Sequence, residues 1–268
     1  MKYVVNNQAL SYEAHGENIR GKNVTLLKNA VDLTAQTAWA KTGFSIENLF
    51  LPTTYQAFAN ATHTLLLDLW RSAGLNVPDN FLLDQYHTLT SRPEAHLAAI
   101  DKTRLLFTDD FPLGITALEN RISEICQVPL ITKNPYDGQS IFHFRIIRPN
   151  STDNNPLHRD VWLEDFDNCI NLYIPIAGSN EHSSLIILPG SHHWPESRFE
   201  RTKAGAVINA VKFNVPAVIS IDGEYSVMRP DPAENEVLIF SPYLIHGGSV
   251  NLNTDKTRIS IEIRLWRK

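Results

Sequence analysis

Two spacings of hydrophobic residues divide the chain near its middle. In the first half, apolar side chains recur at helical intervals in several long segments. These segments are residues 26–40, 55–73, 94–107 and 115–128. Gly74 follows the second segment and Pro93 precedes the third, as is typical of a helix end and a first helical turn. Residues 1–134 are therefore predicted to be mainly helical.

From Ser140 onward the pattern changes to short runs of β-branched and aromatic residues, which predict strands. These runs are residues 141–147, 169–176, 184–188, 217–221, 236–240 and 258–266. Ten of the 15 prolines lie in residues 135–268, so breakers are dense and the elements must be short. A succession of short strands favours a sandwich or a barrel in this half.

The last run, residues 258–266, alternates strictly between two kinds of side chain. One face carries Ile259, Ile261, Ile263 and Leu265, and the other carries Arg258, Ser260, Glu262 and Arg264. Such alternation predicts a strand with one apolar and one polar face. The polar face could point into solvent. Alternatively it could line a polar pocket, with the isoleucines packed beneath the N-terminal helices.

Composition describes an ordinary globular chain and excludes several classes of partner. The 268 residues, 43% of them hydrophobic, are enough to bury a substantial core, and we treat residues 1–268 as a single domain. A net charge of -5 without a basic run argues against nucleic acid. No apolar stretch approaches the roughly 20 residues of a membrane span. Two cysteines and a polar N-terminus without a signal-like apolar region predict the reducing cytoplasm.

Two segments of the second half indicate a metal site. In His158-Arg159-Asp160 the histidine and the acid are two residues apart, so on an extended backbone both side chains leave the same face. His246 follows the apolar run 236–240 and supplies a third ligand. Two His and one carboxylate form the facial triad of non-haem Fe(II) oxygenases, which leaves positions open for co-substrate and dioxygen. The alternative for an isolated His-x-Asp is a surface pairing without a metal.

Arg258 adds an anion-binding group to this pattern. It stands shortly after His246, at the start of the last alternating run. Its planar fork can bind a carboxylate through two hydrogen bonds, which suits the distal carboxylate of a 2-oxo diacid whose other end chelates iron. The alternative is a surface cation on an edge strand.

The order of these pieces resembles the phytanoyl-CoA dioxygenase family of Fe(II)/2-oxoglutarate oxygenases. The matching pieces are His158-Arg159-Asp160, Leu188-Pro189-Gly190-Ser191-His192, His246-Gly247-Gly248-Ser249-Val250-Asn251 and Arg258. The resemblance covers about residues 142–266. It implies an α+β fold, with a double-stranded β-helix (a cupin-like jelly roll) in residues 135–268. The helices of residues 1–134 would then pack on one sheet as a buttress and could supply a lid. Residues 144–160 and 171–192 are similar to the branch found in aminoglycoside and other sugar-related biosynthesis.

The resemblance also implies roles for single residues. The implied Fe(II) ligands are His158, Asp160 and His246. Arg258 would bind the carboxylate of 2-oxoglutarate, the co-substrate used together with O2. The family often has Ser two positions after the distal His; this chain has Gly248 there, and Ser249 is the nearest candidate hydroxyl. Related halogenases replace the carboxylate ligand with a small residue, so Asp160 argues against halogenation.

Further residues are candidates for the same pocket. Asn171 and Tyr173 alternate with apolar neighbours and could line the same pocket as the triad and contact the co-substrate, or else lie on a solvent-facing strand edge. Arg145 stands among bulky apolar residues, where contact with 2-oxoglutarate competes with a structural ion pair. His192, after the Pro-Gly-Ser turn, is interpreted as scaffold. The polar segment 85–92 could form a loop over the barrel mouth.

The sequence therefore predicts a Fe(II)/2-oxoglutarate-dependent dioxygenase that hydroxylates a small polar metabolite, such as a sugar or aminocyclitol derivative. The rival hypothesis is a metal-bearing jelly roll without oxygen activation, either a sugar-binding module or an isomerase. Arg258 separates the two, because a binding module has no reason to hold a carboxylate-binding fork beside its metal.

Overall fold

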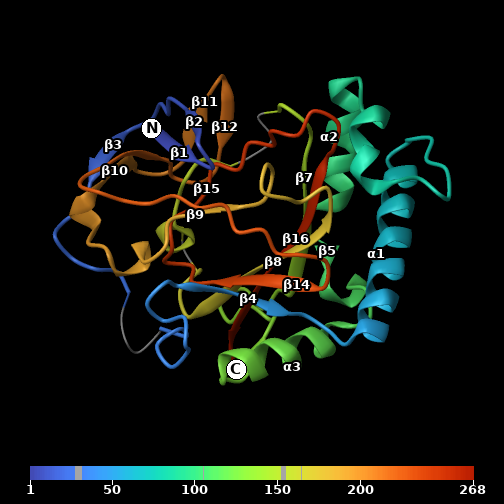
Figure 1. Ribbon diagram of the computed structural model, residues 1–268, viewed down its shortest axis with the longest axis horizontal. Coiled ribbons are helices and arrows are strands. Elements are labelled where there is room, and N and C mark those ends of the chain that lie inside the picture. The colour runs from blue at the N-terminus through green and yellow to red at the C-terminus, as the bar shows by residue number, and fades with distance from the viewer. Residues whose placement is uncertain (28–31, 105, 152–154, 164) are drawn as a thin grey trace.

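The computed structural model describes residues 1–27, 32–104, 106–151, 155–163 and 165–268. The fold is α+β, with helices on one side of a large sheet and small sheets on the other (Figure 1). The α-helices are α1 (Pro52–Ser72), α2 (Pro93–Thr103) and α3 (Ile115–Cys126). The short 3₁₀ segments are η1 (Leu83–Leu89), η2 (Thr108–Asp110), η3 (Asp160–Trp162), η4 (Ser191–His193) and η5 (Glu196–Arg198).

The large sheet is antiparallel and contains most of the predicted strands. Its order is β4 (Phe44–Asn48), β14 (Glu236–Phe240), β8 (Cys169–Ala177), β16 (Arg258–Arg267), β7 (Ile141–Ile147) and β5 (Leu106–Phe107), while β6 (Leu130–Ile131) pairs with the end of β16. The predicted runs 141–147 and 236–240 coincide with β7 and β14.

Small antiparallel sheets form the opposite wall of a jelly roll. They pair β1 (Lys2–Val5) with β2 (Gln8–Ser11), β10 (Phe199–Thr202) with β3 (Asn18–Arg20) and β13 (Val218–Ile221), β11 (Ala206–Ile208) with β12 (Val211–Phe213), and β9 (Ile186–Ile187) with β15 (His246–Gly247). Side chains of β8 and β14 pack against Ile187 of β9 and Leu244, which precedes β15. This packing closes the barrel around the site described below.

The alternating strand β16 uses both of its faces. Its isoleucines belong to the main core, together with Leu66 and Trp70 of α1. On the other face, Arg258 and Ser260 are buried inside the barrel. The pocket interpretation of this strand is therefore confirmed, because the helices cover the apolar face and leave the polar face only the barrel interior.

The N-terminal half differs from the sequence prediction in three places. Residues 32–43 form turns and a link to β4, not the helix predicted for residues 26–40, of which 28–31 lie outside the described residues. Strands β1 to β4 precede the first helix, and β4 joins the large sheet beside β14. α2 ends at Thr103, and the predicted helix 94–107 finishes in the strand β5. Short strands such as these carry too few residues to show a period.

The segment 85–92 packs under the start of β16. Within η1 the side chain of Tyr86 is fully buried in the main core. The backbone N–H of Thr257 donates to the carbonyl of Asp84 (2.7 Å), and that of His87 donates to the Thr257 hydroxyl (3.1 Å). This part of the chain supports the strand that carries Arg258; it is not a loop over the barrel mouth. In the described chain, no helix has the length and apolar character needed to cross a bilayer.

Candidate metal centre

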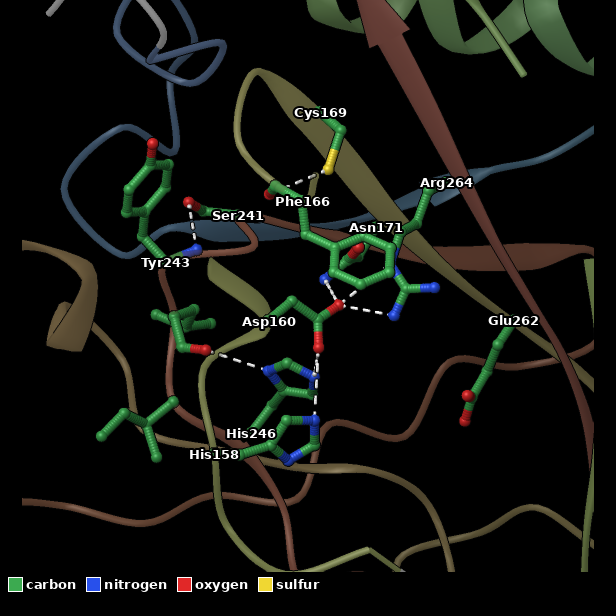
Figure 2. Close-up of polar contacts among 12 residues, drawn as sticks. His158, Asp160, Phe166, Cys169, Asn171, Ser241, Tyr243, His246, Glu262 and Arg264 are labelled. Carbon is green, nitrogen blue, oxygen red and sulfur yellow. Dashed lines mark hydrogen bonds and ion pairs between the residues drawn. The ribbon is translucent and has the colours of Figure 1, made fainter. Parts of the chain in front are cut away.

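Three buried side chains converge at the end of the β9–β15 pair (Figure 2). His158 and His246 face each other across an antiparallel bridge, with backbone N–H to carbonyl distances of 2.8 and 3.0 Å. Asp160 begins η3, where its backbone N–H donates to the carbonyl of Pro242 (3.0 Å). One ligand atom from each of the three residues lies within 4.8 Å of the others. The structure thus brings together the triad that the sequence predicts.

The hydrogen bonds of the two imidazoles determine which nitrogen faces the centre. Nδ1 of His158 lies 2.8 Å from the carbonyl oxygen of Pro156, and Nδ1 of His246 lies 2.9 Å from that of Leu244. A carbonyl only accepts, so each Nδ1 carries the proton and each Nε2 of the neutral ring presents a lone pair. The Nε2 atoms lie 3.2 and 3.4 Å from Oδ1 of Asp160. Three acceptor atoms that face one another need a cation between them, so this donor set fits a metal.

Electrostatics favour the ligand forms of these groups. Burial lowers the pKa of His158, and the nearby His246 lowers it further, so the neutral imidazole is favoured. Burial by itself would raise the pKa of Asp160. The Arg264 guanidinium outweighs that effect and holds the pKa of Asp160 well below its usual range. A deprotonated carboxylate and neutral imidazoles are the forms that bind metals.

The second oxygen of Asp160 is held by two neighbours. Oδ2 accepts hydrogen bonds from Nδ2 of Asn171 (3.0 Å) and from Nε (3.0 Å) and Nη2 (2.6 Å) of Arg264. Because Oδ2 is occupied, only Oδ1 is directed at the centre, so the carboxylate is positioned to bind a metal through one oxygen. The amide of Asn171, predicted to contact the co-substrate, is used here to orient a ligand.

Gly247 allows the two histidine segments to approach. It has φ +114°, and a Cβ at this position would lie 2.2 Å from the carbonyl oxygen of Pro156 and 3.2 Å from Nδ1 of His158. The same Pro156 carbonyl fixes the His158 tautomer. A larger residue would therefore displace the group that orients a ligand.

Arg258 lies in the same cavity and keeps free donors. Its side chain is buried, Nη1 lies 3.3 Å from the carbonyl oxygen of Ser183, and the guanidinium lies over the ring of Tyr173 at 5.5 Å. Its Nε has no hydrogen-bond partner among the described residues. A buried guanidinium with an unused donor is a site for an anion.

The remaining predicted cofactor residues already have partners. Arg145 forms an ion pair with Glu262, with Nη2 3.0 Å from Oε2, which is the structural ion pair that the sequence left open. Ser249 donates to the carbonyl of Gly247 (3.1 Å) and accepts from a backbone N–H of β9. The hydroxyl of Tyr173 lies 2.7 Å from that of Ser179. Their predicted contacts with 2-oxoglutarate stay predictions.

The triad and Arg258 line a cavity of about 160 Å³. The sequence identified its polar wall in Asn171, Tyr173, Glu262 and Arg264, but not its apolar residues. The apolar lining residues that lie outside every predicted run are Leu163, Phe166 and Val215. The guanidinium carbon of Arg264 lies over the ring of Phe166, 4.4 Å from the ring centroid. No periodic signal marks these three residues, because they belong to irregular segments.

Residues next to the ligands serve as scaffold. Arg159 points away from the centre, where its buried guanidinium bonds to Glu196 and to the carbonyl of Ser191. The indole N–H of Trp162 donates to the same Glu196 (3.0 Å). Nε2 of His192 lies 2.9 Å from the carbonyl of Ala40. The Pro-Gly-Ser-His turn is thus tied to the ligand segment, as expected of scaffold.

Comparison with known proteins gives only distant likenesses. The chain matches no family profile, and no curated protein sequence is similar to it. Among solved structures it is similar to AviO1 from Streptomyces viridochromogenes Tue57, with 15% identity, a TM-score of 0.48 and coverage of 91% of this chain and 96% of the other. A structure of EctD from S. alaskensis with 2-oxoglutarate and 5-hydroxyectoine is also similar. It has 12% identity, a TM-score of 0.48 and coverage of 96% of this chain and 86% of the other.

A third similar structure is SnoK, a non-heme alpha ketoglutarate dependent carbocyclase from nogalamycin biosynthesis. It has 14% identity, a TM-score of 0.45 and coverage of 91% of this chain and 87% of the other. These values do not assign the chain to a family. Membership of the phytanoyl-CoA dioxygenase family stays a hypothesis.

Proposed function

We propose that this protein is a Fe(II)/2-oxoglutarate-dependent dioxygenase that hydroxylates a small polar metabolite. The observation that carries the proposal is the geometry of one cavity. Two imidazole lone pairs and one carboxylate oxygen converge there, and a buried arginine with a free donor lines the same wall. A facial set of two His and one carboxylate leaves coordination positions open, and the arginine gives a diacid co-substrate its second contact.

Each residue has a distinct part in this proposal. His158, Asp160 and His246 hold Fe(II), which would supply dioxygen activation coupled to the conversion of 2-oxoglutarate to succinate and carbon dioxide. Arg258 binds and orients the distal carboxylate of 2-oxoglutarate. The apolar residues around Phe166 exclude bulk water from the cavity. A sugar-binding module or an isomerase would leave the buried fork of Arg258 without a purpose.

The substrate is proposed to be a small hydroxylated compound, such as a sugar or aminocyclitol derivative. Polar side chains on the inner face of β8 and β16 support this, since a long acyl chain would need an apolar channel. With a net charge of -5 we expect no nucleic-acid partner, and we expect the enzyme to act in the cytoplasm. Succinate formation with sugars, aminocyclitols, free amino acids and acyl-CoA thioesters, measured side by side, tests the substrate class.

The proposed function is tested by replacing a ligand. Asp160→Ala should abolish stoichiometric Fe(II) binding and all succinate formation from 2-oxoglutarate, because the two imidazoles alone hold the metal weakly. Iron content and succinate release are measured on the same preparations. Asp109→Ala, which removes an exposed acid of η2, is the matched control and should behave as the unmodified protein. Normal succinate formation by Asp160→Ala would refute the assignment.

A further inference from the structure

The charges that line the cavity do not balance. Among the described residues of its wall are three arginines and two acids, namely Arg145, Arg258, Arg264, Asp160 and Glu262. With the ligand imidazoles neutral, as metal binding requires, the described part of the wall carries one surplus positive charge. A divalent cation and the dianion of 2-oxoglutarate cancel each other, so the loaded cavity keeps the same surplus.

Pairing the charges assigns the surplus to one residue. Arg145 is neutralised by Glu262, with Nη2 3.0 Å from Oε2. In the proposed function Arg258 faces the distal carboxylate of 2-oxoglutarate. Once Asp160 and the proximal carboxylate of 2-oxoglutarate balance the metal, the charge of Arg264 has no counter-ion among the described residues of the wall. An uncompensated charge in a partly enclosed cavity is costly and attracts an anion.

Arg264 also has the geometry to bind that anion. Only one edge of its guanidinium, Nε and Nη2, contacts Asp160. Its Nη1 has no hydrogen-bond partner within the described chain, and the side chain keeps 22% of its surface exposed on the cavity wall. Phe166 supports the guanidinium plane from one face at 4.4 Å and so restricts its movement. The second edge is therefore free, held in place and adjacent to the metal ligands.

We propose that the substrate carries one carboxylate, which binds the free edge of Arg264. This inference rests on the proposed function and narrows it. Among small hydroxylated metabolites, sugar acids and cyclitol carboxylic acids fit the surplus charge. A purely cationic aminocyclitol would add to it. Arg264 is then a specificity-determining residue as well as a neighbour of a metal ligand.

The test uses protein loaded with Mn(II), which holds the site without turnover, and saturated with 2-oxoglutarate. The probes are a panel of sugar acids and cyclitol carboxylic acids, each paired with its own carboxamide of the same shape. Calorimetry gives the dissociation constant of each probe, and retained 2-oxoglutarate shows that both molecules bind together. We expect the preferred acid to bind at least about tenfold tighter than its carboxamide.

Variants of the Arg145–Glu262 pair change the charge without touching a metal ligand. Arg145→Gln removes the surplus and should reduce the preference for the acid, whereas Glu262→Gln adds a charge and should increase it. The double variant restores the original sum and should restore the preference. At Arg264 itself, Arg264→Gln should abolish the preference and Arg264→Lys should keep part of it, with Mn(II) content measured in each because Arg264 contacts Asp160.

The outcomes separate this inference from the proposed function. If 2-oxoglutarate fails to bind, the proposed function is contradicted. A preference for the acid that Arg264→Gln abolishes would then still support the charge inference, and a preference that Arg264→Gln leaves intact would overturn it. The inference is overturned if acids bind no tighter than their carboxamides or only by displacing 2-oxoglutarate. It is also overturned if the preference is the same in Arg145→Gln, the unmodified protein and Glu262→Gln.

Discussion

At the scale of single residues, the site depends on where each polar atom finds its partner. Oδ2 of Asp160 accepts hydrogen bonds from Asn171 and Arg264, so Oδ1 is directed at the two imidazoles. Arg258 is the opposite case, because its Nε is buried without a partner within the described chain. Satisfied groups orient the ligands, and unsatisfied ones mark where a molecule binds.

Removing this unsatisfied group should weaken co-substrate binding. Arg258→Ala is expected to raise the Michaelis constant for 2-oxoglutarate by more than about tenfold, since losing one partner of a buried charged pair costs about 2 to 5 kcal/mol. Arg258→Lys keeps the charge but not the fork and should give an intermediate constant. The Michaelis constants of both variants are measured from the rate of succinate formation at varied 2-oxoglutarate concentration. An unchanged constant would assign the contact to Arg145 or Arg264.

At the scale of elements, the backbone bridge between His158 and His246 of β15 positions the metal ligands through close contact. Gly247 is required because a Cβ there would lie 2.2 Å from the Pro156 carbonyl that orients His158. The strand β16 supplies the opposite wall of the cavity. Its apolar face packs in the main core and stabilises the fold, and its polar face lines the cavity.

Gly247→Ala is expected to weaken Mn(II) binding and to lower the melting temperature. Gly114→Ala is its matched control, since Gly114 also has a positive φ (+78°) but open space around the position of a Cβ. Both substitutions impose backbone strain of about 1 kcal/mol or more, and this strain should lower the stability of both variants. Only the Cβ of Gly247→Ala also clashes with the Pro156 carbonyl, so only this variant should change metal affinity. Equal metal affinities in the two variants would mean that the close approach does not orient His158.

Ile261→Ala tests the other face of β16. Ile261 is fully buried against the helices, so its loss should cost about 2 to 5 kcal/mol of unfolding free energy. Its side chain points away from the cavity, and the dissociation constants for Mn(II) and 2-oxoglutarate should stay unchanged. Denaturant titration and calorimetry measure the two effects. A parallel loss of metal binding would contradict the separation of the faces.

At the scale of the whole molecule, acid should destabilise the fold through buried histidines. Nε2 of His192 is bonded to the carbonyl of Ala40, and its Nδ1 is buried without a partner among the described residues. Burial lowers the pKa of His192 to about 4. The unfolded chain, with a histidine pKa of about 6.5, therefore takes up a proton first, so stability is full above pH 6.5 and falls as the pH drops toward 4.

The corresponding measurement is the unfolding free energy of His192→Leu between pH 7 and pH 4. The unmodified protein should lose on the order of 3 kcal/mol through this group over that range, and the variant should show a shallower loss. His193→Leu is the control, because that neighbouring imidazole is exposed. Identical pH dependence in His192→Leu and the unmodified protein would refute this account.

The sequence by itself determined the chemical groups of the site and the strands that carry them. The spacing of His158 and Asp160 and the alternation of β16 are local properties, because the backbone period fixes which side chains share a face. The type of ligand follows from residue identity alone. These features could therefore be predicted before any contact was known.

The tertiary structure decided how those groups pair. Arg264 meets Asp160 across 104 residues, and Arg145 meets Glu262 across 117. It also brought β4 into the large sheet, turned the segment 85–92 under β16 and placed Phe166 on the cavity wall. Contacts between distant segments depend on sheet order and on which face the helices cover, and neither is encoded in a local period. The surplus charge on the described part of the cavity wall can be assigned to Arg264 only after this pairing is known.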